Sequence, residues 1–244
     1  MVETKRFIFA FAAMFCASFT LPTFADEVSD RIIAAMQHPD RDEADSARDA
    51  ARKPLEVIGF IGIESGMSVL DVSAGGGWYS ELLAAAVGAD GRVVAQNISR
   101  FAERAAPVLA KKMERYPNIE SIVAETTGYG LDGQMDAAWT ALNLHDPANR
   151  SRESGLQFLK AIFDALKSGG VLAVIDHEGS AGNDNPALHR IEVATAVGFL
   201  EQAGFVVEAQ SYLLNNPADD QSLHMRDESL ERNTDRFVLR ARKP

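Results

Sequence analysis

Two short polar segments that follow apolar runs carry the side chains best suited to chemistry, residues 143–147 and residues 176–178. An imidazole, whose ordinary pKa is about 6.5, can accept a proton at neutral pH. A neighbouring amide can orient a substrate, and a carboxylate can orient the imidazole. We predict that His145 is such a base and that Asp146 orients it. The residues of this predicted catalytic edge are His145, Asn143, Asp146 and His177.

Two other interpretations of these segments stay open. Asn143 and Asp146 could cap a turn before Pro147 while His145 packs in the core. The histidines could instead hold a divalent metal ion, because imidazole and carboxylate suit several ions. The carboxylates available for that role are Asp146, Asp176 and Glu178. Their spacing matches no compact metal motif, so the sequence predicts no metal site.

A glycine-rich turn lies earlier in the chain, between a short apolar run that contains Asp71 and a segment with helical periodicity. Glycines at 75 and 77 allow a ligand to approach the backbone closely. The amino terminus of the following helix favours an anionic group. The turn could simply be a tight connection, but a strand before it and a helix after it favour a ligand site.

Short β-branched runs alternate with amphipathic segments from residue 66 onward, which is typical of βαβ units and a parallel sheet. The predicted strands are 68–72, 92–96, 119–123, 135–140, 171–176, 206–211 and 236–240. The predicted helices between them are 79–87, 101–115, 152–166 and 187–203. Because only polar sequence separates the last two strands, we expect them to pair antiparallel at a sheet edge. The fold class is therefore a doubly wound, mostly parallel α/β sheet.

The chain before this domain divides into two parts. Lys5 and Arg6 precede the apolar run 7–19, and Ala25 offers a cleavage position. Residues 1–25 therefore have the pattern of a signal peptide, which implies export to a bacterial periplasm, with an uncleaved anchor as the alternative. Residues 26–65 form a predicted helical segment, and 66–244 form the α/β domain. No other segment reaches the roughly 18 apolar residues of a membrane span, so we expect no stable membrane insertion after cleavage.

Charge and cysteine content exclude several classes of protein. The 244 residues carry a net charge of −11, which argues against binding to nucleic acid, whose phosphates require a basic surface. The one cysteine excludes an internal disulfide and a metal site built from cysteines. It is Cys16, within the predicted leader, so the processed chain would carry no thiol, which suits an oxidising compartment.

The glycine-rich turn resembles the acid-x-Gly-x-Gly-x-Gly pattern of S-adenosylmethionine-dependent methyltransferases with a seven-stranded, Rossmann-like sheet. The matching positions are Asp71, Ser73, Gly75 and Gly77, with serine at the first glycine position. The chain more closely resembles a group of exported methyltransferases. The shared segments there are 48–54, 77–79, 143–146, 188–191 and 234–239. The resemblance spans nearly all of the processed chain and implies the seven-stranded Rossmann-like fold.

The resemblance also implies a cofactor and the residues that bind it. The cofactor would be S-adenosylmethionine, with its methionine end at the glycine-rich turn. Asn97 stands where the family has an acid for the ribose hydroxyls, and Glu125 stands where an acid contacts the adenine amine or is simply a solvated loop carboxylate. The predicted cofactor-binding residues are Asp71, Ser73, Gly75, Gly77, Asn97 and Glu125.

The function expected from this resemblance is methyl transfer to a small acceptor. The alternative is a non-catalytic periplasmic ligand-binding protein on the same scaffold. Arg41, Asp49 and Arg52 could form a lid over the cofactor or a solvated charged helix. Arg190 could meet an anionic acceptor or pair with a surface carboxylate. The rings of Trp78 and Tyr79 could border the sulfonium or pack the first helix onto the sheet.

Overall fold

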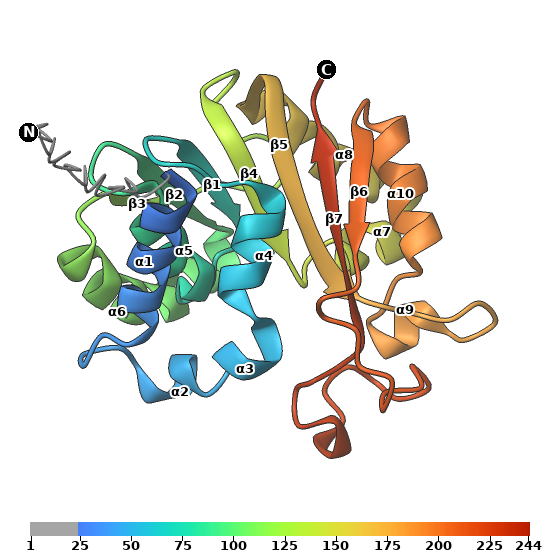
Figure 1. The fold of residues 1–244 in the computed structure, drawn as a ribbon. Helices are drawn as coiled ribbons and strands as arrows, with labels where there is room; N and C mark the ends of the chain where they lie inside the picture. The colour runs from blue at the N-terminus through green and yellow to red at the C-terminus, as the bar shows by residue number, and fades with distance from the viewer. Residues whose placement is uncertain (1–23) are drawn as a thin grey trace, which may run out of the picture.

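The computed structural model describes residues 24–244, which form one seven-stranded sheet with helices on both faces (Figure 1). The strands are β1 (Ser68–Val72), β2 (Arg92–Asn97), β3 (Ile119–Val123), β4 (Met135–Ala141), β5 (Leu166–His177), β6 (Val206–Ser211) and β7 (Arg236–Arg242). The helices are α1 (Phe24–Met36), α2 (Glu43–Ser46), α3 (Asp49–Arg52), α4 (Pro54–Ile61), α5 (Trp78–Val87), α6 (Ser99–Arg115), α7 (His145–Arg150), α8 (Arg152–Ala165), α9 (Asn185–Leu188) and α10 (Val193–Gln202), with a 3-10 turn at Glu228–Leu230.

The strand order is β3-β2-β1-β4-β5-β7-β6. Neighbouring strands from β3 to β5 are parallel, whereas β7 runs antiparallel to both β5 and the edge strand β6. The order reverses between β1 and β4, which places the switch point of a doubly wound sheet beside the glycine-rich turn. This arrangement confirms the predicted fold class and the antiparallel pairing of the last two strands.

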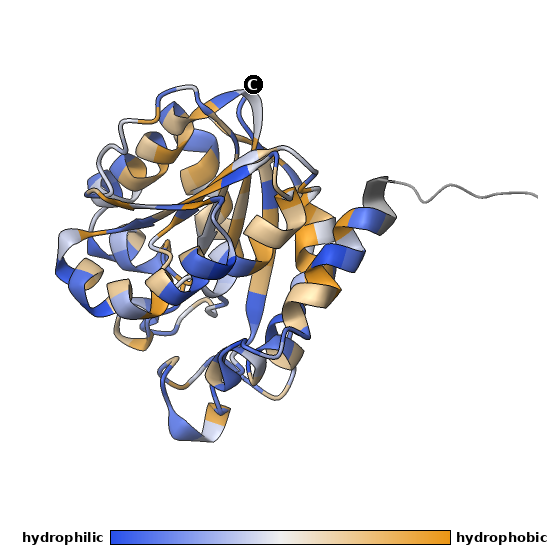
Figure 2. Ribbon diagram, turned by 90° about the vertical axis from the view of Figure 1, so that its left-hand side faces the viewer, coloured by the Kyte–Doolittle hydropathy of each residue, from blue (hydrophilic) through white to orange (hydrophobic). Residues whose placement is uncertain are grey.

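Both faces of the central strands are buried, as a parallel sheet requires. Val69 packs in the core layer beneath α1, α4, α5 and α6, while its neighbours Leu70 and Val72 pack in the layer beneath α8 and α10. Successive side chains of a strand point to opposite faces, so a short apolar run without polar alternation supplies both layers. Figure 2 shows the hydrophobic residues gathered in the interior of the fold and the hydrophilic ones on its outer loops.

The predicted helix 187–203 is wrong. The chain instead forms the short helix α9 and then α10. His189 ends α9 with a φ of 52°, and Ile191 forms a parallel bridge with Glu178 before α10 begins. The apolar periodicity of α10 continues back through Ile191 in the sequence, so periodicity alone did not show the interruption.

The segment before β1 packs on the sheet domain rather than forming a separate unit. Helix α1 lies against α5, burying Val28 and Ile32 in the same core layer as α5. Three hydrogen bonds tie the segment after α2 to distant sequence. Lys53 Nζ donates to the Leu213 carbonyl at 2.8 Å. In the other direction, Arg236 Nη2 donates to the Ala51 carbonyl at 2.8 Å. Arg240 Nε donates to the Ile61 carbonyl at 2.9 Å.

A buried group of charges, here called the ionic cluster, joins this segment to α5 and α6. Its members are Arg41, Asp45, Asp49, Glu81, Lys112 and Arg115. Arg41 bonds both carboxylate oxygens of Asp49, at 2.7 and 2.9 Å. Arg115 and Lys112 reach in from α6, and Glu81 of α5 lies between them with no exposed surface. The solvated charged helix considered for Arg41 and Asp49 is therefore wrong.

The predicted leader falls almost entirely outside the described residues, since the structure describes the chain only from residue 24. From that residue onward, no helix combines the length and the apolar character needed to cross a membrane.

Glu81→Gln should destabilise the protein by about 3 kcal/mol, because it leaves the buried cations of the ionic cluster short of one counter-charge. Glu114→Gln, at an exposed position on α6, should change the free energy of unfolding by less than about 0.5 kcal/mol. Urea unfolding of both variants measures the difference. Equal small effects would mean that the cluster contributes little to stability.

Candidate functional site

Two adjoining cavities open at the carboxyl ends of β1, β2 and β4. The larger has a volume of about 580 Å³ and the smaller of about 320 Å³. Both are lined by Ser73, Gly75, Gly76, Val108 and Asn143. The glycine-rich turn therefore forms the boundary between the two cavities, at the position where doubly wound sheets bind their ligands.

The turn depends on backbone conformations that favour glycine. Gly75 and Gly77 have φ values of 57° and 77°, and Ser73 adopts the same left-handed region with a φ of 54°. A Cβ at Gly77 would lie 2.7 Å from Leu109 Cδ1, so α6 leaves no room for a side chain there. A Cβ at Gly75 would have no neighbour within 4 Å, so this stretch of backbone is open to a ligand.

Two amide side chains of β2 hold this turn. Asn97 accepts from the Gly75 N–H at 2.8 Å and donates to the Gly75 carbonyl at 3.1 Å. Gln96 accepts from the Ser73 N–H at 2.9 Å and donates to the Ala124 carbonyl at 2.6 Å. Asn97 lines the larger cavity, but its amide bonds the turn, and the expected contact with a ribose stays a prediction. The role of Gln96 was missed, because a glutamine in an apolar strand gives no signal of its partner.

Asp71, the penultimate residue of β1, lies in the wall of the smaller cavity, with only 3% of its surface exposed. Its Oδ2 accepts a hydrogen bond from Ser80 Oγ at 2.6 Å. Burial raises the pKa of Asp71 from 3.8 to about 7, although the Ser80 hydrogen bonds and the charge of Arg52 act in the opposite direction. The site therefore holds a carboxyl group that changes charge near neutral pH and that a cationic ligand would keep ionised.

Arg52 lines the smaller cavity together with Asp71. Its guanidinium lies 4.6 Å from the centroid of the Trp78 ring and 5.9 Å from that of Tyr79. Burial lowers the pKa of Arg52 to about 10, so it is still a cation at neutral pH. Within residues 24–244 its side chain makes no ion pair. Trp78 and Tyr79 both border the smaller cavity and pack in the hydrophobic core. The rings therefore pack α5 onto the sheet and also face a possible ligand.

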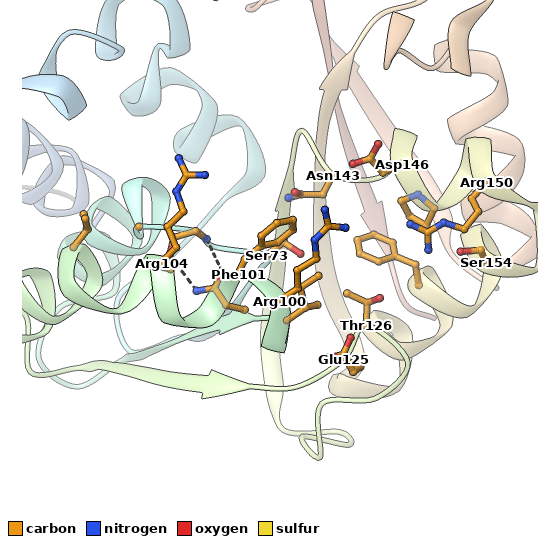
Figure 3. Close-up of a pocket in the computed structure, with 18 residues that line it drawn as sticks. Ser73, Arg100, Phe101, Arg104, Glu125, Thr126, Asn143, Asp146, Arg150 and Ser154 are labelled. Atoms are coloured by element: carbon orange, nitrogen blue, oxygen red, sulfur yellow. Dashed lines mark hydrogen bonds between the residues drawn. The ribbon is translucent and has the colours of Figure 1, made fainter. Parts of the chain in front are cut away.

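The larger cavity is bounded by three cationic side chains, with Arg100 and Arg104 on α6 and Arg150 at the end of α7 (Figure 3). Glu125 lines it after β3, where its Oε1 accepts from Ser99 Oγ at 2.6 Å and from the Ser99 N–H at 3.3 Å. Glu125 thus holds the first residue of α6 as well as facing the cavity. Its expected contact with an adenine stays a prediction.

Asn143 lies where the two cavities meet, two residues after the end of β4. Its Nδ2 donates to the Ala141 carbonyl at 2.8 Å and to that of Val72 at 3.3 Å. These bonds use the donors of the amide and leave its oxygen available to a ligand. Leu142 before it has a φ of 63°, which turns the chain sharply between the strand and Asn143.

His145 is fully buried and held by Asp176, not by Asp146. Asp176 accepts from the backbone N–H of His145 at 2.8 Å, and its Oδ1 lies 2.7 Å from His145 Nδ1. The prediction that Asp146 orients this ring is wrong, because Asp146 Oδ1 lies 3.4 Å from the opposite nitrogen, Nε2. Burial lowers the pKa of His145, but the carboxylates of Asp176 and Asp146 together outweigh it and leave that pKa raised.

His177 and His145 do lie together, with ring centroids 5.6 Å apart. His177 Nδ1 is 2.6 Å from Thr234 Oγ1, and burial lowers the pKa of His177 to about 3, so this ring is neutral. Of the four residues of the predicted edge, Asn143 and Asp146 line a cavity, whereas the two histidines lie behind that wall.

Both interpretations of Arg190 are wrong. It is fully buried and bonds both oxygens of Asp219, at 2.9 and 3.0 Å. It also donates to the carbonyls of Leu223 and Glu178. Arg190 therefore anchors the long connection between β6 and β7 against α9, and it contacts neither cavity.

No protein-family model matches this chain. No curated protein matches it either.

Many solved structures share the fold. A methyltransferase from Aquifex aeolicus that depends on S-adenosylmethionine has a TM-score of 0.62 and 21% identity, covering 88% of this chain and 98% of its own. The [4+2]-cyclase SpnF has a TM-score of 0.61 and 17% identity, covering 91% of this chain and 97% of its own. The S-adenosylmethionine-dependent methyltransferase SibL has a TM-score of 0.57 and 18% identity, and the match covers 82% of this chain and 57% of the SibL chain. At these identities the likeness shows a common fold.

The buried carboxyl of Asp71 should make stability depend on pH. Because the pKa of Asp71 in the folded protein is raised to about 7, the protonated carboxyl contributes fully to the free energy of unfolding below about pH 4. This contribution is lost as the pH rises through 7. The free energy of unfolding of the native protein, relative to that of Asp71→Asn, should therefore fall between pH 5 and pH 8. Urea unfolding of both proteins at the two pH values measures this. A difference between them that does not change with pH would contradict it.

Proposed function

We propose that this protein is a methyltransferase that uses S-adenosylmethionine and acts on a small acceptor. The observation that carries the proposal is the pair of cavities divided by the glycine-rich turn, with Asp71 and an unpaired Arg52 in the smaller one. The shared fold with S-adenosylmethionine-dependent methyltransferases supports the same cofactor. The fold alone does not select methyl transfer, since SpnF is a cyclase.

The residues in the smaller cavity fit the methionine end of this cofactor, which carries an ammonium and a carboxylate. The guanidinium of Arg52 would bind the carboxylate, since an arginine fork matches a carboxylate with two charge-assisted hydrogen bonds. Asp71 lies in the same cavity and would balance the ammonium group. The backbone at Gly75 is open to a ligand, so the cofactor can cross from one cavity to the other at this residue.

The larger cavity suits the adenosyl part and the acceptor. Glu125 and Asn97 line it from the ends of β3 and β2. The three arginines around it favour an acceptor that carries negative charge. This concentration of cations in a chain of net charge −11 supports an anionic small molecule rather than nucleic acid as the acceptor.

The bound cofactor would supply an electrophilic methyl group on sulfur, so this chain has mainly to bind and align the acceptor. Asn143 can orient the acceptor with its free amide oxygen, because it borders both cavities. Asp146 is the carboxylate that faces the larger cavity, so it is the residue placed to accept a proton there. His145 lines neither cavity, and its Nε2 lies 3.4 Å from Asp146 Oδ1.

Arg52→Gln should weaken binding of S-adenosylhomocysteine, the demethylated cofactor, by at least about tenfold, because it removes a charge-assisted contact to the carboxylate. Lys111→Gln is the matched control, since it removes the same charge from an exposed position on α6 outside both cavities. Titration calorimetry at fixed ionic strength measures both affinities.

The native protein should also bind S-adenosylmethionine and unfold at a higher temperature in its presence. No heat of binding and no thermal protection with either ligand would sink the proposed function. Binding without transfer to any anionic acceptor would favour the ligand-binding alternative. If Arg52→Gln and Lys111→Gln bound S-adenosylhomocysteine with equal affinity, Arg52 would not be the residue that binds the carboxylate of the cofactor.

Export belongs to the same proposal and depends on the charged and apolar pattern of residues 1–25. A periplasmic fraction from a Gram-negative host should contain a chain that begins at Asp26, as measured by mass spectrometry of the intact protein. A variant with Lys5→Glu and Arg6→Glu should remain in the cytoplasm with its leader intact. A native periplasmic chain that retains Met1 would contradict cleavage and favour an anchor.

A further inference from the structure

Four histidine rings from separate parts of the chain form a row beside the larger cavity. The centroids of His177 and His145 lie 5.6 Å apart, those of His145 and His189 5.6 Å, and those of His189 and His224 5.1 Å. Asp146 reaches into this row from α7, with its Oδ1 2.9 Å from His189 Nδ1. The fold thus gathers imidazoles and a carboxylate from β5, α7, the end of α9 and the connection before β7.

The buried nitrogen of His145 has no partner. Asp176 Oδ1 lies 2.7 Å from Nδ1 of this ring, and because a carboxylate only accepts hydrogen bonds, Nδ1 is the nitrogen that donates. In the neutral ring, Nε2 then presents a lone pair. Within the described part of the chain Nε2 has no hydrogen-bond partner, and it faces Asp146 Oδ1 at 3.4 Å. A lone pair and a carboxylate repel each other unless a proton or a metal cation lies between them.

The distances fit a metal ion in that place. Ligand atoms about 2.1 Å from a metal ion lie about 3.0 Å apart in an octahedral site and about 3.4 Å apart in a tetrahedral one. Asp146 Oδ1 lies 3.4 Å from His145 Nε2 and 2.9 Å from His189 Nδ1. One ligand atom from each of these three residues lies within 4.8 Å of the other two.

The surroundings match those of metal-binding histidines and leave room for a further ligand. A histidine that binds a metal commonly donates its other N–H to a carboxylate, as His145 does to Asp176. The side chains of Asp146 and His189 keep 54% and 42% of their surface exposed, so an ion can enter. Asp146 also lines the larger cavity, so a bound ion would have its open positions on that side.

We infer that His145, Asp146 and His189 form a binding site for a divalent transition-metal ion such as Zn²⁺, with open coordination positions toward the larger cavity. Two imidazoles and one carboxylate favour such an ion over Mg²⁺, which prefers oxygen ligands. The inference goes beyond the proposed function and does not depend on cofactor binding, because the site uses none of the residues assigned to the cofactor. It shares Asp146 with the proposed function, and with an ion bound that carboxylate would act as a ligand rather than as a proton acceptor.

Titration of the full chain, purified without a polyhistidine tag and with no cofactor present, tests the site. Zinc should bind with a stoichiometry of one, and cobalt should produce visible absorption bands typical of nitrogen and oxygen ligands. His189→Ala and Asp146→Asn should each weaken zinc binding by at least about tenfold. Both are partly exposed, and thermal unfolding checks that each variant is folded. His38→Ala is the matched control, because His38 also lies near a carboxylate, 4.0 Å from Asp40.

The expected pattern is tight zinc binding by the native protein and by His38→Ala, with weaker binding by the two cluster variants. Absence of stoichiometric zinc binding would overturn the inference. It would also be overturned by zinc binding that the cluster variants leave unchanged, by an equal loss in His38→Ala, or by a preference for Mg²⁺. None of these outcomes bears on binding of S-adenosylhomocysteine, so failure of the metal site and failure of the proposed function are distinguishable.

Discussion

The amide side chains of Gln96 and Asn97 hold the backbone of the turn that follows β1, and both cavities depend on this contact. The turn has left-handed residues at 73, 75 and 77, which an unsupported chain would exchange freely with other conformations. Hydrogen bonds from the neighbouring strand select one conformation. Beyond the turn, Ser80 of α5 donates to the Asp71 carboxylate of β1. The cavity boundary is thus fixed by β2, a strand that contributes little of its own surface to either cavity.

Buried charge organises the two sides of the site in different ways. On one side the ionic cluster neutralises carboxylates and cations against each other and fastens α2 and α3 over the smaller cavity. Arg52 lies next to that cluster and is also a cation, but within the described residues no carboxylate forms an ion pair with it. On the other side Asp176 holds one nitrogen of His145 and leaves the other without a partner. In each case charged groups that are paired with one another support a neighbouring group, Arg52 or His145 Nε2, which can still bind a ligand.

The sequence predicted the sheet well, because short apolar runs buried on both faces have a clear signature. It predicted the residues near the site but not their partners. Asp146 follows His145 directly and was assigned to it, yet α7 turns that carboxylate toward His189, and Asp176, from the next strand, takes its place. His189 was not singled out, because 44 positions separate it from His145, and only the interruption between α9 and α10 brings the rings together. Contacts of this kind depend on tertiary structure and leave no local pattern.

The hydrogen bonds of Lys53, Arg236 and Arg240 join residues 51–61 to residues 213–240, and this has a consequence for the order of events during biogenesis. A ribosome completes α3 long before it completes β7. The ionic cluster can fasten α2 and α3 as soon as α6 is complete. The three hydrogen bonds of Lys53, Arg236 and Arg240 must instead wait for almost the entire chain, and contacts so distant in sequence form late and slowly. A nascent chain that stops before β7 also leaves β6 without its neighbour, so its sheet ends at β5. It lacks the bonds that Arg236 and Arg240 make to the carbonyls of Ala51 and Ile61.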